Sequence, residues 1–200
     1  MKIAVYGATG MVGSGIAAEA LRRGHDVTAV TRSGSAVEGA SARAAELSEL
    51  EASRELAAGH DAVVVSVAPD RTGGPHSSFM AAHRAIAGTT VPARVLIVGG
   101  AGALEVGGVR LKDMPDFPEA YKPEAATMGD VLEAYRSSAG LDWTMLAPAP
   151  QIAPGERTGS YRLGLDSPAG GSISSQDFAV AAVDELEEPK HRNRRFTAAN

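Results

Sequence analysis

The segment Lys2-Ile-Ala-Val-Tyr-Gly-Ala-Thr-Gly-Met-Val-Gly13 decides the fold of this chain. Its first residues form a short apolar run that stops abruptly at Gly7, which is typical of a buried parallel strand. Further glycines follow at positions 10 and 13. Gly7 allows a tight turn out of the strand, Gly10 removes a Cβ where a pyrophosphate would approach the backbone, and Gly13 lets a helix pack closely on the sheet.

The residues after this turn have the pattern of a helix. Apolar side chains recur at helical spacing from Met11 to Leu21, and the pattern ends at Arg22-Arg23-Gly24. A helix that begins here directs its free N–H groups and its positive dipole end at phosphates. The strand, turn and helix together favour a dinucleotide site. The alternative is a glycine turn in an α/β protein that binds no nucleotide.

Composition narrows the classes of function. The chain has 200 residues, a formal net charge of −5 and no cysteine. This length suits one domain that spans residues 1–200. Without cysteine there can be no disulfide, thiolate metal site or thiol nucleophile, and the acidic balance argues against nucleic acid as a partner. No signal sequence or apolar run of membrane length is recognisable, so we expect a cytoplasmic protein with no membrane partner.

The second predicted strand, residues 26–31, ends beside the position that meets the adenosine ribose in nucleotide-binding folds. An acidic residue there binds the free 2′-hydroxyl of NAD, whereas an arginine pairs with the additional phosphate of NADP. Arg32 occupies this position, Ser33 adds a hydroxyl donor, and Asp26 lies at the wrong end of the strand. The pattern favours NADPH as the cofactor. The alternative is a solvated loop arginine.

The rest of the chain alternates between strand and helix patterns, which predicts an α/β fold with a doubly wound parallel sheet. We expect further strands at residues 43–47, 62–68, 94–98, 141–146, 159–163 and 195–198. We expect further helices at residues 49–58, 77–87, 124–139 and from Ser174–Asp177 to residue 187, with Ser48 and Glu51 as a capping box before the first. Residues 70–75 should form a flexible connection over the cofactor, and residues 105–123 an insertion or lid.

A second glycine-rich stretch, Gly99-Gly100-Ala101-Gly102, follows the strand predicted at residues 94–98. It lies at the carboxyl edge of the sheet, where ligands bind in open α/β folds. We interpret it as a close approach of the backbone to the nicotinamide, with Gly99 and Gly100 leaving room for a flat ring. Pro148 and Pro150 would form a stiff wall in the loop predicted at residues 147–152.

Four stretches, Gly7–Gly13, Arg32, Gly99–Gly102 and Pro154–Gly159, carry a family resemblance. Together they resemble the atypical short-chain dehydrogenase/reductase group, and most closely its NADH-flavin reductases and the NmrA-like NAD(P)H-binding proteins related to biliverdin reductase B. The resemblance implies a seven- or eight-stranded Rossmann fold with a small C-terminal substrate lobe, its substrate side built from about residues 103–123 and 148–175. The predicted cofactor contacts are Gly7, Thr9, Gly10, Met11, Val12, Gly13, Arg32, Ser33, Leu47, Ser66, Val67, Ala68, Gly99, Gly100 and Pro148.

The usual catalytic pair of the superfamily is missing. Its carbonyl reductases use a tyrosine acid with a lysine four residues later, but the residues four positions after the four tyrosines here are Gly10, Ala125, Ala139 and Leu165. Tyr121 and Lys122 are adjacent, so on a helix they would point about 100° apart. A flavin or quinone can take its proton from water. The sequence therefore predicts a reductase that passes hydride from NADPH to a flavin or quinone-like acceptor, with FMN or riboflavin as candidate substrates.

Two residues are predicted to act on the substrate. Tyr121, near the lid, would donate a hydrogen bond to it. Gln151 stands where related enzymes with biliverdin activity place a histidine, which argues against biliverdin as the substrate. The expected partner is a small-molecule acceptor, and the protein should be a monomer or a homodimer.

Two other functions stay open. One is a redox sensor that binds NADP(H) without turnover and regulates a partner. The other is an epimerase, isomerase or dehydratase, for which Tyr121, His76 and Asp70 are weak acid/base candidates. His76 and His83 could share a helix face towards the site, but they lack acidic or cysteine partners at ligand spacing, so we expect no metal. Trp143 is expected to pack in the core.

Overall fold

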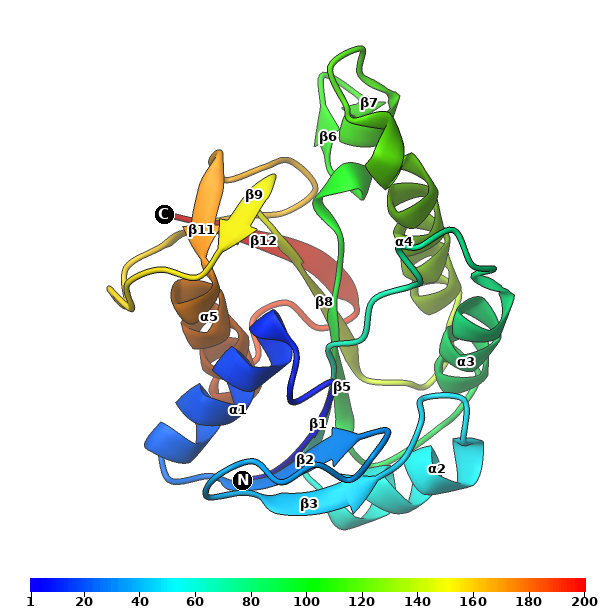
Figure 1. The fold of residues 1–200 in the computed structure, drawn as a ribbon. Coiled ribbons are helices and arrows are strands. Elements are labelled where there is room, and N and C mark those ends of the chain that lie inside the picture. The colour runs from blue at the N-terminus through cyan, green and yellow to red at the C-terminus, as the bar shows by residue number, and fades with distance from the viewer.

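The computed structural model describes residues 1–200 and contains one large sheet that runs through the whole molecule (Figure 1). Its eight strands are, in chain order, β1 (Lys2–Tyr6), β2 (Asp26–Thr31), β3 (Ser41–Ala44), β4 (Ala62–Val65), β5 (Arg94–Val98), β8 (Trp143–Pro148), β10 (Arg162–Gly164) and β12 (Arg194–Ala199). They lie in the order β10-β12-β8-β5-β4-β1-β2-β3, and all neighbours are parallel except β10 and β12. This confirms the predicted doubly wound sheet.

Five α-helices cover the two faces of the sheet: α1 (Met11–Arg22), α2 (Leu50–Gly59), α3 (Ser77–Ala87), α4 (Lys122–Arg136) and α5 (Ser175–Glu187). Helices α1 and α5 pack together on one face, and α2, α3 and α4 cover the other (Figure 1). Because successive strand residues point to opposite faces, the apolar side chains divide into two cores. Ile16 of α1 and Phe178 of α5 lie in the core on one face of the sheet, and Tyr135 and Trp143 lie in the core on the other. The predicted core position of Trp143 is confirmed.

Short elements gather at the carboxyl end of the sheet. They are η1 (Ala101–Ala103), β6 (Glu105–Val106), β7 (Val109–Arg110), η2 (Leu111–Asp113), η3 (Glu119–Tyr121), β9 (Gln151–Ala153) and β11 (Ser172–Ser174). Strands β6 and β7 form a hairpin that projects at the top of Figure 1, and β9 pairs with β11 at the same end of the molecule. The predicted lid at residues 105–123 therefore contains a hairpin and two 3₁₀ turns.

Several predicted elements agree with the structure. Helix α3 and strand β5 have the predicted bounds, and α5 ends at the predicted residue. Ser174 caps α5 as expected, since its Oγ accepts a hydrogen bond of 2.9 Å from the N–H of Asp177.

The bounds of the other strands need correction. The strand predicted at residues 43–47 is β3, Ser41–Ala44, because this register pairs it with Thr28–Thr31 of β2. The strand predicted at residues 62–68 ends at Val65, where the chain turns beside Gly7. Strand β8 runs through residue 148 and β9 begins at residue 151, so the predicted loop at residues 147–152 is largely strand. Strand β10 lies three residues later than its predicted start at residue 159, and β12 extends one residue further at each end.

Two helix starts were also mispredicted. Helix α4 begins at Lys122 rather than residue 124, because Pro123 fits the first turn of a helix, and it ends at Arg136. The capping box is wrong: α2 begins at Leu50 without a side-chain cap. The N–H of Glu46 instead donates to the carboxylate of Glu49 at 3.0 Å, which orders the turn before this helix. No helix in the structure combines the length and apolarity needed to cross a membrane.

Candidate functional site

The candidate site lies at the carboxyl edge of the sheet. Strands β1, β2, β4, β5 and β8 run parallel, so the loops that leave their C-terminal ends meet along one edge. From β1 the chain continues to β2 and β3 on one side, and then to β4, β5 and β8 on the other. Open sheets bind ligands in the crevice at such a switch point.

The glycine turn between β1 and α1 depends on two missing side chains. Gly7 has φ +74°, and a Cβ there would lie 2.1 Å from the carbonyl oxygen of Ser66. A Cβ on Gly13 would lie 2.1 Å from the carbonyl oxygen of Gly7. Both glycines are therefore required by close packing of backbone on backbone. A Cβ on Gly10 would meet nothing nearer than the Gly7 carbonyl oxygen at 3.4 Å, so the chain leaves space there.

The N-terminus of α1 is open to an anion. No side chain caps it, and the first bond of the helix runs from the N–H of Ser14 to the carbonyl of Gly10 at 2.8 Å. The N–H groups of Met11, Val12 and Gly13 have no acceptor in the chain. Uncapped N–H groups at the positive end of a helix dipole favour negative charge, and Thr9 and Met11 are exposed beside them.

Arg32 extends from the end of β2 with a free guanidinium. Its side chain is exposed and takes part in no hydrogen bond or ion pair. The turn that carries it is ordered by Thr31, whose Oγ1 accepts from the N–H of Ser35 at 2.8 Å. The hydroxyls of Ser33 and Ser35 lie 2.6 Å apart. The loop thus presents one cation and two hydroxyls towards solvent.

The loop after β4 runs directly beside the glycine turn. The Ser66 carbonyl packs on Gly7, Val67 is half-buried against the core, and Ala68 is exposed. Leu47 is different, since it is 8% exposed and packs in the core under α2 and α3. Its side chain is directed into the protein, which leaves its backbone as the part that could meet a ligand.

The structure corrects our interpretation of Gly99 and Gly100. A Cβ on Gly99 would lie 2.8 Å from Cγ of Met145, and one on Gly100 would lie 3.2 Å from Cβ of Met128. The space freed by these glycines is therefore filled by β8 and α4 and not left for a flat ring. The space beside Gly102 is also filled by the chain, because a Cβ added there would lie 2.4 Å from Cβ of Ala125. This second glycine stretch is explained by packing of the chain on itself.

The residues predicted to act on substrate lie on separate elements at this end of the sheet. Tyr121 ends η3, is 57% exposed and has no hydrogen-bond partner for its hydroxyl. Lys122 bonds to the carboxylate of Glu119 and so forms no pair with Tyr121. Gln151 begins β9 with an exposed side chain, and Pro148 ends β8 half-buried.

The other tyrosines are committed elsewhere. The hydroxyl of Tyr6 lies 2.9 Å from that of Ser53, and Tyr161 donates to Asp184. Tyr135 is fully buried, with its hydroxyl 3.1 Å from Nδ1 of His83. Tyr121 is therefore the one tyrosine with a free hydroxyl.

The two histidines proposed to share a face do not do so. His83 is fully buried in an aromatic cluster with Phe79 and Tyr135, and burial lowers its pKa to about 4. His76 precedes α3 and uses both ring nitrogens, at 2.6 Å from Oγ1 of Thr127 and 2.8 Å from the carbonyl oxygen of Asp70. Neither imidazole is free for acid/base chemistry in this arrangement.

The loop predicted to be flexible is fastened to α4. Arg71 forms a two-pronged ion pair with Glu124, with N–O distances of 2.7 and 2.6 Å. His76 forms a second link through Thr127. Glu124 and Thr127 could not be found from the sequence, because their partners lie about fifty residues away and no local pattern connects them.

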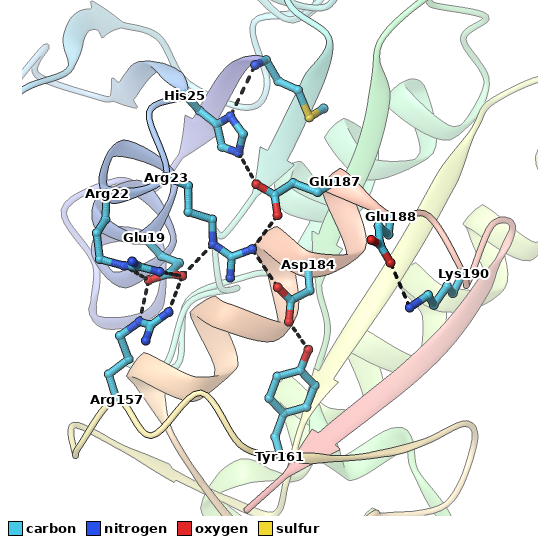
Figure 2. Close-up of polar contacts among 11 residues, drawn as sticks. Glu19, Arg22, Arg23, His25, Arg157, Tyr161, Asp184, Glu187, Glu188 and Lys190 are labelled. Atoms are coloured by element: carbon cyan, nitrogen blue, oxygen red, sulfur yellow. Dashed lines mark hydrogen bonds and ion pairs between the residues drawn. The ribbon is translucent and has the colours of Figure 1, made fainter.

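A network of charged groups connects helix α1, helix α5 and the segment around Arg157 (Figure 2). Glu19 of α1 is 4% exposed and accepts hydrogen bonds from Arg22, Arg23 and Arg157 at 2.7 to 2.9 Å. Burial raises the pKa of Glu19, but hydrogen bonds from the three guanidinium groups outweigh it and hold the pKa well below its usual range. Arg23 also reaches Asp184 of α5 at 2.7 Å, which joins the two helices. The segment around Arg157 is itself bonded to α5, because the Thr158 hydroxyl and the N–H of Gly159 donate to Asp177.

A mostly parallel sheet with a glycine turn and an uncapped helix N-terminus at its switch point defines a Rossmann-fold nucleotide-binding protein. The family can be stated more narrowly. The profile of the NAD(P)H-binding family matches residues 7–189, and the chain belongs to this family, an atypical branch of the short-chain dehydrogenase/reductase group.

Known relatives cover the whole chain. The uncharacterized protein YwnB of Bacillus subtilis is 39% identical to this chain, in an alignment that covers 100% of this chain and 99% of that protein. The crystal structure of a "putative NADH-flavin reductase" from Streptococcus pneumoniae is 33% identical with a TM-score of 0.89, and covers 100% of this chain and 99% of its own. A "putative epimerase" from Bacteroides thetaiotaomicron is 36% identical with a TM-score of 0.86, and covers 99% and 96%.

The residues at the glycine turn fit the nicotinamide cofactor that this family binds. The chain offers three N–H groups without acceptors where a pyrophosphate would lie, and the backbone at Gly10 has no side chain in the way. The carboxyl ends of the strands beyond this turn supply the surface for the rest of a dinucleotide.

Proposed function

We propose that this protein is a reductase that binds NADPH and delivers its hydride to a flat conjugated acceptor of the flavin or quinone class. The observation that carries the proposal is the pairing of an uncapped α1 N-terminus with a free Arg32 at the same edge of the sheet. A dinucleotide with an additional ribose phosphate has an anionic group for each of them.

In this proposal the chain contacts the cofactor along its whole length. The N–H groups of Met11, Val12 and Gly13 bind the pyrophosphate, with Gly7, Thr9 and Gly10 shaping the turn. Arg32 and Ser33 bind the 2′-phosphate, and the backbone at Leu47 borders the adenine side. The loop of Ser66, Val67 and Ala68 contacts the ribose, and Gly99, Gly100 and Pro148 border the nicotinamide end through their backbones.

The acceptor class follows from the proton donors that the chain offers. NADPH, when bound, supplies a hydride, and the reduced acceptor then takes one proton from solvent. A simple ketone would need a positioned acid at its oxygen, a contribution of typically 10²- to 10⁴-fold. Tyr121 is not such an acid, since its side chain is 57% exposed and nothing holds its hydroxyl in place. A conjugated ring, which spreads the incoming charge, needs chiefly correct stacking and distance.

Two similar proteins have names that bear on the type of reaction, and the names differ. The similar Streptococcus pneumoniae protein carries a name for NADH-flavin reduction, which fits the acceptor class. The similar Bacteroides thetaiotaomicron protein carries the name of an epimerase, which would use and regenerate the cofactor. We favour reduction, because both ring nitrogens of His76 and the carboxylate of Asp70 are engaged in hydrogen bonds, and the Tyr121 hydroxyl has no partner to act with.

The cofactor half of the proposal is tested with Arg32→Ala. Loss of a charged partner for the phosphate should weaken NADPH binding by about ten- to a hundred-fold in a calorimetric titration and leave NADH binding unchanged. Arg54→Ala is the matched control, because Arg54 is also an exposed arginine but pairs with Glu51 on α2. Equal NADPH affinity in Arg32→Ala and the unmodified protein would contradict the phosphate role.

A further inference from the structure

The loop between β4 and α3 contains a preformed turn. The carboxylate of Asp70 accepts hydrogen bonds from the N–H groups of Thr72 at 2.8 Å and Gly74 at 2.6 Å. These backbone hydrogen bonds hold the pKa of Asp70 below its usual range. We call residues Asp70–His76 the strap. The turn is thus closed by its own aspartate.

Two pairs of side chains attach the strap to the first turns of α4. At one end, the guanidinium of Arg71 meets the Glu124 carboxylate through two bonds of 2.7 and 2.6 Å. Two parallel N–H···O bonds fix orientation as well as distance. At the other end, Nδ1 of His76 lies 2.6 Å from Oγ1 of Thr127, which is 8% exposed.

The partners of His76 assign the roles of its two ring nitrogens. The Asp70 carbonyl can only accept, so Nε2 of His76 must be the donor in the 2.8 Å bond between them. In the neutral ring Nδ1 then accepts from the Thr127 hydroxyl. His76 therefore links the end of the strap to Asp70, the first residue of the strap, and to Thr127 of α4.

The part of α4 that receives these links also borders the loop after β5. A Cβ on Gly100 would lie 3.2 Å from Met128, and one on Gly102 would lie 2.4 Å from Ala125. Glu124 directly precedes Ala125, and Thr127 directly precedes Met128, in the first turns of α4. The strap is therefore fastened to the part of α4 that packs on the loop after β5.

We propose that Arg71–Glu124 and His76–Thr127 are positioning pairs that hold the strap as the outer wall of the acceptor site. This inference rests on the proposed function. Release of either pair would let the wall move outwards, while the glycine turn and Arg32 stay in place. The acceptor would then bind less tightly, and the affinity for NADPH would not change.

Glu124→Ala and Thr127→Val each release one pair. Thr127→Ser keeps the hydroxyl and is the conservative variant. Glu133→Ala is the matched control, because Glu133 lies on the same helix and loses an ion pair with Arg136. We expect amide hydrogen exchange over residues 70–76 to accelerate about five-fold or more in Glu124→Ala and Thr127→Val, as for loss of an exposed or partly exposed polar contact. The KM for FMN should rise by a similar factor, with kcat and NADPH affinity within about two-fold.

Three outcomes would overturn the inference. Unchanged exchange in both releasing variants would mean that the pairs do not hold the strap. Faster exchange with an unchanged KM for FMN would mean that the strap is not a wall of the acceptor site. Equal effects in Thr127→Ser or Glu133→Ala would point to general loosening of α4.

A failure of the proposed function can be told apart from a failure of the strap inference. If the unmodified protein oxidises NADPH with none of the acceptors, the equilibrium affinity for FMN replaces KM. Weaker FMN binding in Glu124→Ala and Thr127→Val would support the strap inference even then. FMN that fails to bind, or that binds all variants equally, would overturn it.

Discussion

The two helical layers of this protein are fastened by different physical means. On the α1–α5 side, a buried carboxylate and its arginines join two helices and the segment around Arg157 (Figure 2). On the α3–α4 side, an aromatic cluster around His83 fills the interior, and more exposed pairs attach the strap. Buried charges therefore fix the layer that carries the proposed pyrophosphate site, whereas more exposed pairs fix the strap beside the proposed acceptor site.

Glu19 and Glu124 illustrate the difference between the two layers. Both Glu19 and Glu124 accept two-pronged hydrogen bonds from an arginine distant in sequence. The Glu19 side chain is 4% exposed, and that of Glu124 is 20% exposed with a partner, Arg71, that is 64% exposed. Removing a buried charge that several partners share costs much more than removing an exposed pair.

The largest expected effect concerns the glycine turn. Gly7 and Gly24 have similar φ values, +74° and +81°, but a Cβ at Gly7 collides with Ser66 whereas a Cβ at Gly24 meets nothing within 4 Å. Gly24→Ala should cost about 1 kcal/mol of unfolding free energy, the price of the left-handed backbone conformation. Gly7→Ala should cost more than about 4 kcal/mol or prevent folding, measured by urea denaturation. Similar costs for the two variants would mean that the close approach of β4 is unimportant.

The next effect is a dependence of stability on pH from the α3–α4 core. The folded-state pKa of His83 is lowered to about 4 from its ordinary 6.5 by burial. The unfolded chain therefore binds more protons between these values, so stability is complete above pH 6.5 and is lost as the pH falls towards 4. The loss from this group should reach about 3 kcal/mol.

A paired variant isolates this contribution. His83→Leu alone would leave the Tyr135 hydroxyl unbonded in the core, so His83→Leu is combined with Tyr135→Phe. The double variant should have a flatter stability profile between pH 6.5 and 4 than Tyr135→Phe alone, measured by denaturation at each pH. Parallel profiles would show that the imidazole already binds its proton inside the folded protein.

The third effect sharpens the comparison of the two glutamates. Glu19→Ala should lower the unfolding free energy by about 2 kcal/mol, because Arg23 is largely buried and loses a partner. Glu124→Ala should cost less than about 1 kcal/mol. The same denaturation series measures both, and a cost for Glu124→Ala equal to that for Glu19→Ala would remove the distinction between the two layers.

The parts of the fold that are predictable from sequence are those with a regular pattern. The strand and turn at residues 2–13, helix α3 and strand β5 have a clear period and bounding residues, and the structure agrees there. Pro123 misled the prediction of α4, because a proline can open a helix as well as interrupt one. Strands β9 and β11 have three residues each, too few for any period to show.

The site was less accessible from the sequence. Glycine spacing located the turn at Gly7, but the same reasoning misread Gly99 and Gly100, whose missing side chains make room for Met145 and Met128. A glycine indicates a close approach without saying whether a ligand or another part of the chain makes it. The links of Arg71 and Arg157 join residues 53 and 138 positions apart, and such pairs arise from topology alone.

The most direct test of the account is turnover. Purified protein is mixed with NADPH, or separately with NADH, and absorbance of the reduced nicotinamide is followed with and without FMN, riboflavin or a quinone. The account predicts acceptor-dependent oxidation that is faster with NADPH than with NADH and loses this preference in Arg32→Ala. Tight NADPH binding without oxidation by any acceptor would contradict the reductase function and would leave a protein that senses the cofactor.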